Sequence, residues 1–334
     1  MNSDNFSDLG RVEAIERLFE GTPYSPFKNG TLEIRGGAVA VQASKLFQEG
    51  LDFDLTYFPL AHLGHKCVSQ VTGELLADLS HPRALDVVLG ISSKLDFEQI
   101  SVLWSGCVAA AKEYGYSAVS LDLVPSINGL TISVSAVGES ALLTQKRRSK
   151  ARSKDLVCVS GALGAAYFGM RVLEREKKAF ERNESEHPAL ETYKMLVGSY
   201  LKPELDCGVV SAFEQSEIYP SFGYFVNRGL SDAVRRLSRD SGLGVKIYAD
   251  RIPFEGNSFQ LGKELNLDPV SAAMNGGDDC RLLFTVPILE LERFRKDFQT
   301  FDIIGHLSLP EVGSVLVTPD GAELPIKAPG WKND

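Results

Sequence analysis

Cysteine is scarce in this sequence, and the few cysteines stand far apart. The 334 residues contain five of them, none in a Cys-x-x-Cys pair: Cys67, Cys107, Cys158, Cys207 and Cys280. An odd number of scattered cysteines excludes a disulfide framework and provides no zinc-binding spacing. We therefore expect reduced, mostly buried thiols and a cytoplasmic protein.

Long apolar runs and a surplus of basic charge are missing as well. No run reaches the ~20 apolar residues that a membrane-spanning helix needs, and Met1-Asn-Ser-Asp-Asn lacks the basic flank and apolar core of a signal peptide. The 35 basic residues are outnumbered by 44 acidic ones, which gives a net charge of −9. This charge argues against non-specific binding of nucleic acid. We expect neither a membrane nor a nucleic acid as partner.

The sequence does contain enough apolar residues, 44% of 334, to form one large globular domain or two ordinary ones. Helical and strand-like spacings of these residues alternate along the chain. The expected helices cover residues 11–20, 62–79, 97–114 and 231–241. The expected strands cover residues 32–34, 38–41, 84–91, 117–123, 129–138 and 245–248, and residues 156–167 read as strand, turn and helix start.

The stretch Asn275-Gly-Gly-Asp-Asp-Cys-Arg-Leu-Leu-Phe284 places two glycines before two adjacent carboxylates and an apolar strand. Glycines let the main chain approach a ligand while the carboxylates project into the same space. Adjacent acids are also common in ordinary loops. On spacing alone, the ordinary loop is the favoured interpretation.

This stretch is similar to the Gly-Gly-Glu-Asp-Tyr-Glu-Leu-Leu-Phe-Thr motif of thiamine-monophosphate kinases, which belong to the aminoimidazole-ribonucleotide-synthetase-like superfamily of ATP-binding proteins. The similarity extends from Leu9 to Trp331. It implies an α+β, PurM-like fold of two halves, residues 1–140 and 141–334, each a mixed sheet packed with helices. It also implies ATP and Mg²⁺ as cofactors, thiamine monophosphate or another small phosphorylated metabolite as ligand, and a homodimer in which the first-half sheets join.

The resemblance further assigns roles to individual residues. Asp122 is expected to bind metal and nucleotide, and Glu74 stands where the family has a metal-binding aspartate. Since Asp122 lies in an apolar strand and burying a lone charge is costly, we expect a metal or Lys45 as its partner. The other assignments are nucleotide contacts at Arg148 and Asn227, and substrate contacts at Asp52, Asp278 and the ring of Trp331.

Most acidic magnesium ligands of the family are nevertheless missing here. The segment Arg35-Gly-Gly-Ala-Val-Ala replaces a Gly-Asp-Asp-Ala-Ala-Val loop, and Lys45, Phe225 and Arg228 replace acids. A lysine or arginine cannot ligate magnesium and repels it. We infer that Lys45 and Arg228 stand where magnesium ions would lie. Each would pair with one of three acids: Asp122, Glu74 or Asp278.

Three other features of the sequence each allow two interpretations. His62 and His65 are spaced for one helix face and could bind a metal, but without a third ligand we favour packing at the helix entry. The basic segment Gln145–Lys154 is either a solvated linker or a phosphate contact. Gly161 and Gly164 could direct backbone N–H groups toward an anion at a helix start, although we favour a structural turn.

These departures bear on function, because phosphoryl transfer depends on metals and cations positioned around the phosphates. They favour an impaired or inactive homologue with a binding or regulatory role. The alternative is an active kinase that converts thiamine monophosphate and ATP to thiamine diphosphate and ADP with a rearranged metal shell. In that case the remaining ligands would be Asp122, Glu74, Asp278 and Asp279, with Arg148 on phosphate.

Overall fold

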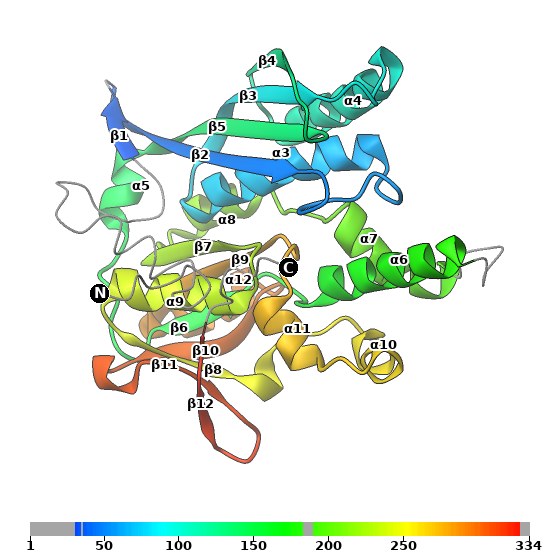
Figure 1. Ribbon diagram of the computed structural model, residues 1–334. Helices are drawn as coiled ribbons and strands as arrows, with labels where there is room; N and C mark the ends of the chain where they lie inside the picture. The colour runs from blue at the N-terminus through cyan, green and yellow to red at the C-terminus, as the bar shows by residue number, and fades with distance from the viewer. Residues whose placement is uncertain (1–30, 35, 183–189, 328–334) are drawn as a thin grey trace, which may run out of the picture.

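The computed structural model describes residues 31–34, 36–182 and 190–327 of the chain. The helix expected at residues 11–20, the replaced loop residue Arg35 and the expected stacking residue Trp331 lie outside these ranges. The described residues form two sheets with helices packed against them, one sheet in each half of the chain (Figure 1).

The first half forms a five-stranded sheet, called sheet 1, in the order β1-β2-β5-β3-β4. Its neighbouring strands are antiparallel, except that β3 and β4 are parallel. The strands are β1 (Thr31–Ile34), β2 (Ala38–Gln48), β3 (His81–Ile91), β4 (Ala118–Pro125) and β5 (Thr131–Ala141). Strand β4 is an edge strand, and all eight of its residues are exposed.

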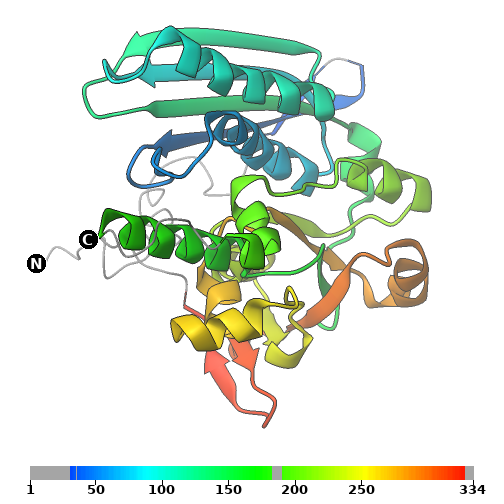
Figure 2. The ribbon, with the colours of Figure 1, turned by 90° about the vertical axis from the view of Figure 1, so that its right-hand side faces the viewer.

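Helix α3 (Leu60–Ala77) lies between sheet 1 and the second half of the molecule, as Figures 1 and 2 both show. It is buried around most of its circumference, with 14 of its 18 residues buried, which is expected of a helix packed on two sides. Helix α4 (Phe97–Glu113) crosses it closely. A Cβ at Gly64 would lie 2.1 Å from the carbonyl oxygen of Leu103, so a larger residue there would force the helices apart.

The second half forms a seven-stranded sheet, called sheet 2, in the order β12-β11-β8-β10-β6-β9-β7. Only the pair of β11 and β8 is parallel. The strands are β6 (Leu156–Val159), β7 (Phe222–Val226), β8 (Gly244–Tyr248), β9 (Arg281–Val286), β10 (Asp302–Ser308), β11 (Ser314–Val317) and β12 (Glu323–Pro325).

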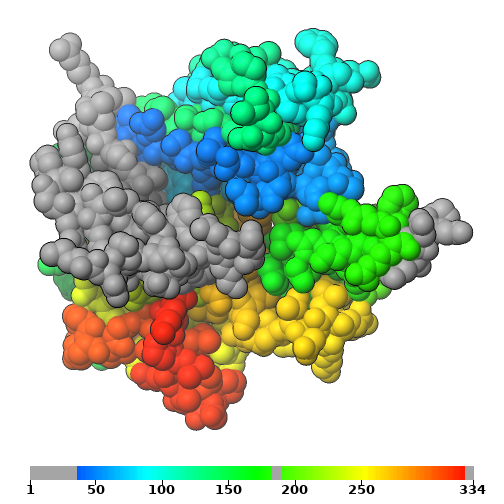
Figure 3. All heavy atoms as spheres, in the orientation of Figure 1, coloured from blue at the N-terminus to red at the C-terminus, as the bar shows by residue number. Residues whose placement is uncertain are grey.

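The short helix α5 (Leu142–Arg147) leads from sheet 1 toward sheet 2. The second half then adds helices on both sides of its sheet (Figure 2). These are α6 (Ala165–Glu181), α7 (Lys194–Leu201), α8 (Val209–Ser216), α9 (Leu230–Ser241), α10 (Ser258–Leu265), α11 (Pro269–Asn275) and α12 (Leu291–Asp297). Figure 3 shows the two halves stacked, with residues of the first half above those of the second.

The α+β architecture with a mixed sheet in each half is confirmed. The elements expected from apolar spacing at residues 84–91, 97–114, 117–123 and 129–138 correspond to β3, α4, β4 and β5, with ends shifted by at most a few residues. The interpretation of β4 as a buried strand is wrong. Its apolar residues alternate as in a core strand, but one edge and much of both faces are open to solvent within a single chain.

Candidate functional site

The two halves meet where α3 packs against β7 and β9 of sheet 2. Helix α3 and strand β7 approach closely because each has a glycine at the contact. A Cβ at Gly73 of α3 would lie 2.2 Å from the ring of Phe225, and a Cβ at Gly223 of β7 would lie 2.0 Å from the carbonyl oxygen of Ala77. This seam brings residues from distant parts of the sequence together, including several that the sequence analysis singled out.

Lys45 and Glu74 meet at this seam. The Nζ atom of Lys45 lies 3.7 Å from Oε1 of Glu74, and their side chains are only 12% and 13% exposed. The same ammonium lies 5.1 Å from the centroid of the Phe225 ring. Burial lowers the pKa of Lys45 to about 8, although the charge of Glu74 acts in the opposite direction. Thus the expected metal ligand Glu74 lies beside a lysine and a phenyl ring, and both of these replace acids of the family.

Arg236 of α9, which the sequence analysis missed, adds a second buried cation. Its Nε lies 2.9 Å from Oδ2 of Asp232, and its Nη2 donates to the carbonyl oxygen of Phe225 at 3.1 Å. Burial alone would lower the pKa of Arg236, but the carboxylates of Glu74 and Asp232 raise it above its ordinary value. The four-residue spacing of Asp232 and Arg236 in an expected helix was the available signal for this pair.

A second polar group surrounds Asp278, in the loop before β9. Its carboxylate accepts from Lys66 Nζ at 3.0 Å and from Gln70 Nε2 at 2.8 Å. Its backbone N–H donates to the carbonyl oxygen of Asn227 at 2.8 Å, and Asn227 Nδ2 in turn lies 3.4 Å from Gln70 Oε1. Asp278 therefore ties the Gly-Gly-Asp-Asp loop to α3 rather than standing free in solvent.

Lys66 is the cation at the centre of this second group, and the sequence analysis did not identify it. Its side chain is 5% exposed. The ammonium lies 3.7 Å from the ring centroid of Tyr200 and 5.2 Å from that of Phe58, which is cation–π geometry. Only the proximity of His62 and His65 in the sequence had drawn attention to this helix entry.

Asp52, expected at the substrate, lies close to this group. Its Oδ2 accepts the backbone N–H of Gln48 at 2.8 Å. Partial loss of solvation raises the pKa of Asp52, and the charge of Asp278 adds to the rise, whereas Arg228 and Lys66 oppose it. The structure therefore brings Asp52, Asp278, Asn227 and Arg228 to one side of the seam.

The expected ion pair of Arg228 is not formed. The side chain is exposed and makes no ion pair with a residue in the described ranges. Two of the three candidate acids have other partners, since Asp278 is bonded by Lys66 and Gln70 and Glu74 lies beside Lys45. Arg228 thus leaves a cation available to a ligand.

Asp122 does not join Glu74. In sheet 1, Lys45 pairs with Val134, Val134 with Val87, and Val87 with Leu121, so these side chains share the face that α3 covers. Asp122 is the next residue and faces the other way. It is exposed, and its Oδ1 accepts the backbone N–H of Leu123 at 2.9 Å. The expectation that Asp122 is buried is therefore wrong for a single chain, and Lys45 is not its partner there. Of the two partners expected, the metal stays a prediction.

No group of three or more His, Cys, Asp or Glu side chains within the described ranges is arranged to hold a metal ion. His65 is engaged by other residues, since its Nε2 lies 3.0 Å from Glu113 Oε2 and its Nδ1 3.2 Å from Ser69 Oγ. The contact with Glu113 joins α3 to α4, whereas Ser69 lies on α3 itself, and both agree with packing at the helix entry.

Arg148 connects the halves at the other end of the seam. Its Nε donates to the carbonyl oxygen of Pro220 at 3.0 Å, and its Nη1 lies 3.8 Å from Asp78 Oδ1 at the end of α3. Burial lowers the pKa of Arg148. The side chain is 15% exposed, so a role on phosphate would require it to exchange these partners.

Asp279 occupies the turn that contains Gly161 and Gly164. Its Oδ2 accepts the backbone N–H of Gly164 at 2.7 Å, and its Oδ1 accepts that of Ala166 at 3.0 Å. The anion at the start of α6 is therefore the protein's own carboxylate, which supports the structural interpretation of this turn. Burial raises the pKa of Asp279 to about 7, against the effect of these two hydrogen bonds.

This carboxyl group makes stability depend on pH. Because its folded pKa exceeds the unfolded value near ~3.9, its contribution is fully present below about pH 4 and is lost as pH rises through about 7. We expect wild type to lose stability relative to Asp279→Asn between about pH 5 and about pH 8, measured by urea unfolding. Asp268→Asn, at the exposed cap of α11, is the control. A wild-type-minus-variant difference that stays constant over this range would contradict the prediction.

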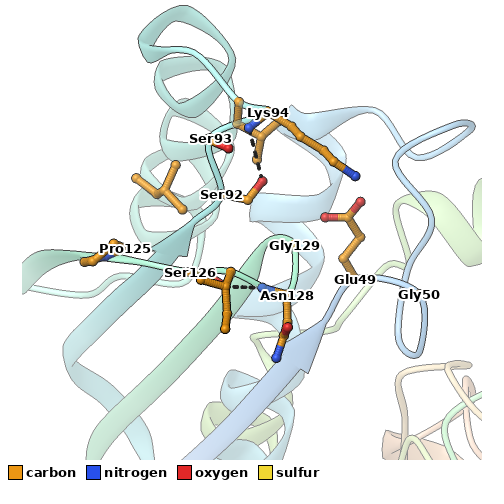
Figure 4. A pocket seen from close by; sticks show the side chains of 12 residues that line it. Glu49, Gly50, Ser92, Ser93, Lys94, Pro125, Ser126, Asn128 and Gly129 are labelled. Atoms are coloured by element: carbon orange, nitrogen blue, oxygen red, sulfur yellow. Dashed lines mark hydrogen bonds between the residues drawn. The ribbon is translucent and has the colours of Figure 1, made fainter.

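A large cavity of about 970 Å³ lies elsewhere, at the end of sheet 1 where the loops after β2, β3 and β4 meet. Its lining mixes polar and apolar residues, and Figure 4 shows Lys94 and Glu49 on facing sides of it. Glu49 is held in place because its Oε2 accepts the backbone N–H of Leu130 at 2.7 Å. None of the residues expected at the nucleotide or substrate lines this cavity.

Comparison with known proteins gives the context for this site. No protein-family model matches the chain. The chain is 25% identical to the thiamine-monophosphate kinase of Aquifex aeolicus (strain VF5) over 341 residues, covering 100% of both sequences. It is 27% identical to that of Pyrococcus horikoshii over 275 residues, covering 81% of this chain and 78% of the relative.

Solved structures agree in fold. AaThiL complexed with AMPPCP and TMP aligns over 100% of both chains with a TM-score of 0.80 and 21% identity. The hydrogenase maturation protein HypE in complex with ATP aligns over 96% of this chain and 92% of its own, with a TM-score of 0.62 and 15% identity. The two mixed sheets and their helices thus form the PurM-like fold.

Within that fold, the two sequence relatives described above, one matched over its full length, are thiamine-monophosphate kinases. Along its length the chain is thus similar to thiamine-monophosphate kinases and diverges from them at about three positions in four. Among the helices in the described part of the chain, none has both the length and the apolar character needed to cross a bilayer.

Proposed function

We propose that this chain is a thiamine-monophosphate kinase-like protein with an eroded magnesium–ATP site, acting through ligand binding or regulation rather than efficient phosphoryl transfer. The observation that supports this most is the filling of the seam by Lys45, Glu74 and Phe225. Phosphoryl transfer relies on metals that neutralise the developing charge. A buried ammonium beside the retained carboxylate competes with a metal for it and repels the metal.

The second polar group supports retention of a ligand. Relatives of this chain are thiamine-monophosphate kinases, and AaThiL was solved with an ATP analogue and TMP. Here Asp52, Asp278 and Asn227 remain on one side of the seam, and Arg228 is exposed with no ion pair in the described ranges. We propose that Arg228 contacts the phosphate of a small phosphorylated metabolite such as thiamine monophosphate.

A thermal-melt series of the full chain tests this function. We expect thiamine monophosphate to raise the melting temperature without magnesium, as RT ln(1 + [L]/Kd) predicts. Millimolar MgATP should give no magnesium-dependent rise, and assays should give no thiamine diphosphate. Arg228→Gln should weaken thiamine monophosphate about ten-fold, whereas Arg235→Gln, at an exposed arginine of α9, should not. A magnesium-dependent rise with turnover would instead establish the active kinase.

We also propose a cytoplasmic homodimer that joins the first-half sheets. Four of the five free cysteines are buried, as expected for reduced thiols. Edge strand β4 exposes Val119, Leu121 and Leu123 at 42%, 38% and 51%, and an exposed apolar edge is suited to pairing with another strand. Asp122, which faces away from Lys45 in its own chain, could then approach the seam of the partner.

The dimer predicts a solution mass of twice 36.5 kDa by light scattering. The double variant Leu121→Lys and Leu123→Lys should be monomeric with an unchanged circular dichroism spectrum, because lysines oppose edge pairing. Leu289→Lys, at a site 89% exposed in the second half, serves as control. A monomeric wild type would refute the homodimer and would leave the ligand-binding proposal unaffected.

A further inference from the structure

A second cavity, of about 510 Å³, lies within the second half of the molecule. It is an open cavity bordered by α11, the first turn of α9, and the hairpin of β11 and β12, which lie together in Figure 1. Neither the Lys45–Glu74 pair nor Asp52 and Asp278 line it. A cavity of this size is typical of small-molecule sites.

Ser231 points to a ligand in this cavity. The residue is 2% exposed and lines the cavity, and its hydroxyl makes no hydrogen bond to a residue in the described ranges. A buried hydroxyl without a partner is unfavourable. The hydroxyl oxygen of Ser231 is reached from the cavity, so whatever fills the cavity supplies its partner.

The lining around Ser231 favours a negatively charged partner, because the carboxylate of the neighbouring Asp232 is paired with Arg236. The residue lies in the first turn of α9, whose N-cap, Gly229, has no side chain to bond the free N–H groups, and this end of a helix carries partial positive charge. Lys327 adds a full positive charge to the lining. The one acidic residue of the lining, Asp268, is already used, because its Oδ2 accepts both the N–H and the hydroxyl of Ser271 at 2.8 Å.

Part of the lining is apolar. Met274 and Ile326 are 5% and 6% exposed, and both line the cavity together with Val270 and Leu316. These side chains suit a ring or a short hydrocarbon rather than a sugar, since they offer no hydrogen-bonding groups. The cavity thus combines an anion-binding end with an apolar wall.

We propose that this cavity binds a small molecule with an apolar ring and one anionic group, either a carboxylate or a phosphate ester. The anion bonds to the Ser231 hydroxyl and the first-turn N–H groups of α9, near Lys327, and the ring packs on Met274 and Ile326. This cavity is separate from the ligand site proposed at the seam, and the two proposals can be tested independently.

The test is a ¹⁹F NMR titration of the full chain with three probes: 4-fluorobenzoate, 4-fluorophenyl phosphate and the neutral 4-fluorobenzyl alcohol. For ligands of about ten non-hydrogen atoms, a Kd near about 1 mM is expected for at least one anion. The alcohol should bind about ten-fold more weakly. The stronger of the two anions identifies whether carboxylate or phosphate is the preferred group.

Variants locate the binding. Ser231→Ala and Lys327→Gln should each weaken the anionic probe, Ser231→Ala by about ten-fold. The matched control is Ser258→Ala, because Ser258 is also fully buried with an unpartnered hydroxyl but lies on α10 outside the cavity. Lys327 is exposed, so its variant remains informative if Ser231→Ala does not fold. No binding of either anion, equal binding of the alcohol, or affinities unchanged in both variants would overturn the proposal.

Discussion

Replacing Lys45 by methionine should lower the free energy of unfolding by about 3–5 kcal/mol. The substitution leaves Glu74, 13% exposed, without the ammonium that lies 3.7 Å away. The pair is also imperfectly satisfied, since neither Lys45 Nζ nor Glu74 Oε2 has a hydrogen-bond partner. For that reason the double variant Lys45→Met with Glu74→Leu should regain most of the loss, because apolar residues of similar volume often replace a buried ion pair without cost.

Urea unfolding of the two single variants and the double variant checks this expectation as a double-mutant cycle. The matched control is the exposed pair Arg83 and Glu139 of the same sheet, whose side chains are 55% and 41% exposed. Arg83→Ala should cost less than about 1 kcal/mol. If the double variant loses the sum of both single losses, Lys45 and Glu74 do not act as one buried pair.

The same lysine gives a pH signature. Its folded pKa of about 8 lies below the ordinary value of 10.5, so between these values the unfolded chain binds more protons than the folded one. Wild-type stability should therefore rise with pH across that window, and the rise should be absent from Lys45→Met. If the free energy of unfolding depends on pH in the same way in both proteins, burial does not lower the pKa of Lys45.

Much of the fold could be predicted from the sequence, and the one element whose burial was wrongly predicted has a physical explanation. Apolar spacing predicted β3, α4 and β5, because these elements bury one face against the rest of the fold. The same rule predicted β4 as a strand but not its exposure. Its alternation resembles a core strand, but burial also requires a neighbour on its free edge, and a single chain provides none.

In the candidate site, too, some residues could be predicted from the sequence and others could not. Lys45 and Glu74 could be named from their positions in the family motifs, and the structure brings them together. Lys66 could not, since its partner Asp278 lies across the seam. For Arg236 the spacing from Asp232 was a signal, but the effect of Glu74 on it depends on the fold. Asp279 could be placed in the motif, but its use at the start of α6 depends on a turn more than a hundred residues earlier.

Returning carboxylates to the seam should restore magnesium binding. In the double variant Lys45→Asp with Arg228→Asp, the new acid at position 45 lies beside Glu74, and the two like charges repel when no cation is present. We expect the variant to be less stable than wild type in a chelator and to gain stability with Mg²⁺. At a concentration 100 times its Kd, the ion would add about 2.7 kcal/mol.

The control for this restoration is Lys45→Asn with Arg228→Asn, which removes both cations without adding carboxylates. Isothermal titration and thermal melts with MgCl₂ should show binding only to the aspartate variant, because magnesium prefers anionic oxygen ligands in near-octahedral geometry. Adding Phe225→Asp should strengthen binding further, since the ring now fills space beside Gly73. If the aspartate variants bind magnesium no better than wild type, the cations at this seam do not stand in for metal ions. The loss of catalytic carboxylates would then need another physical explanation.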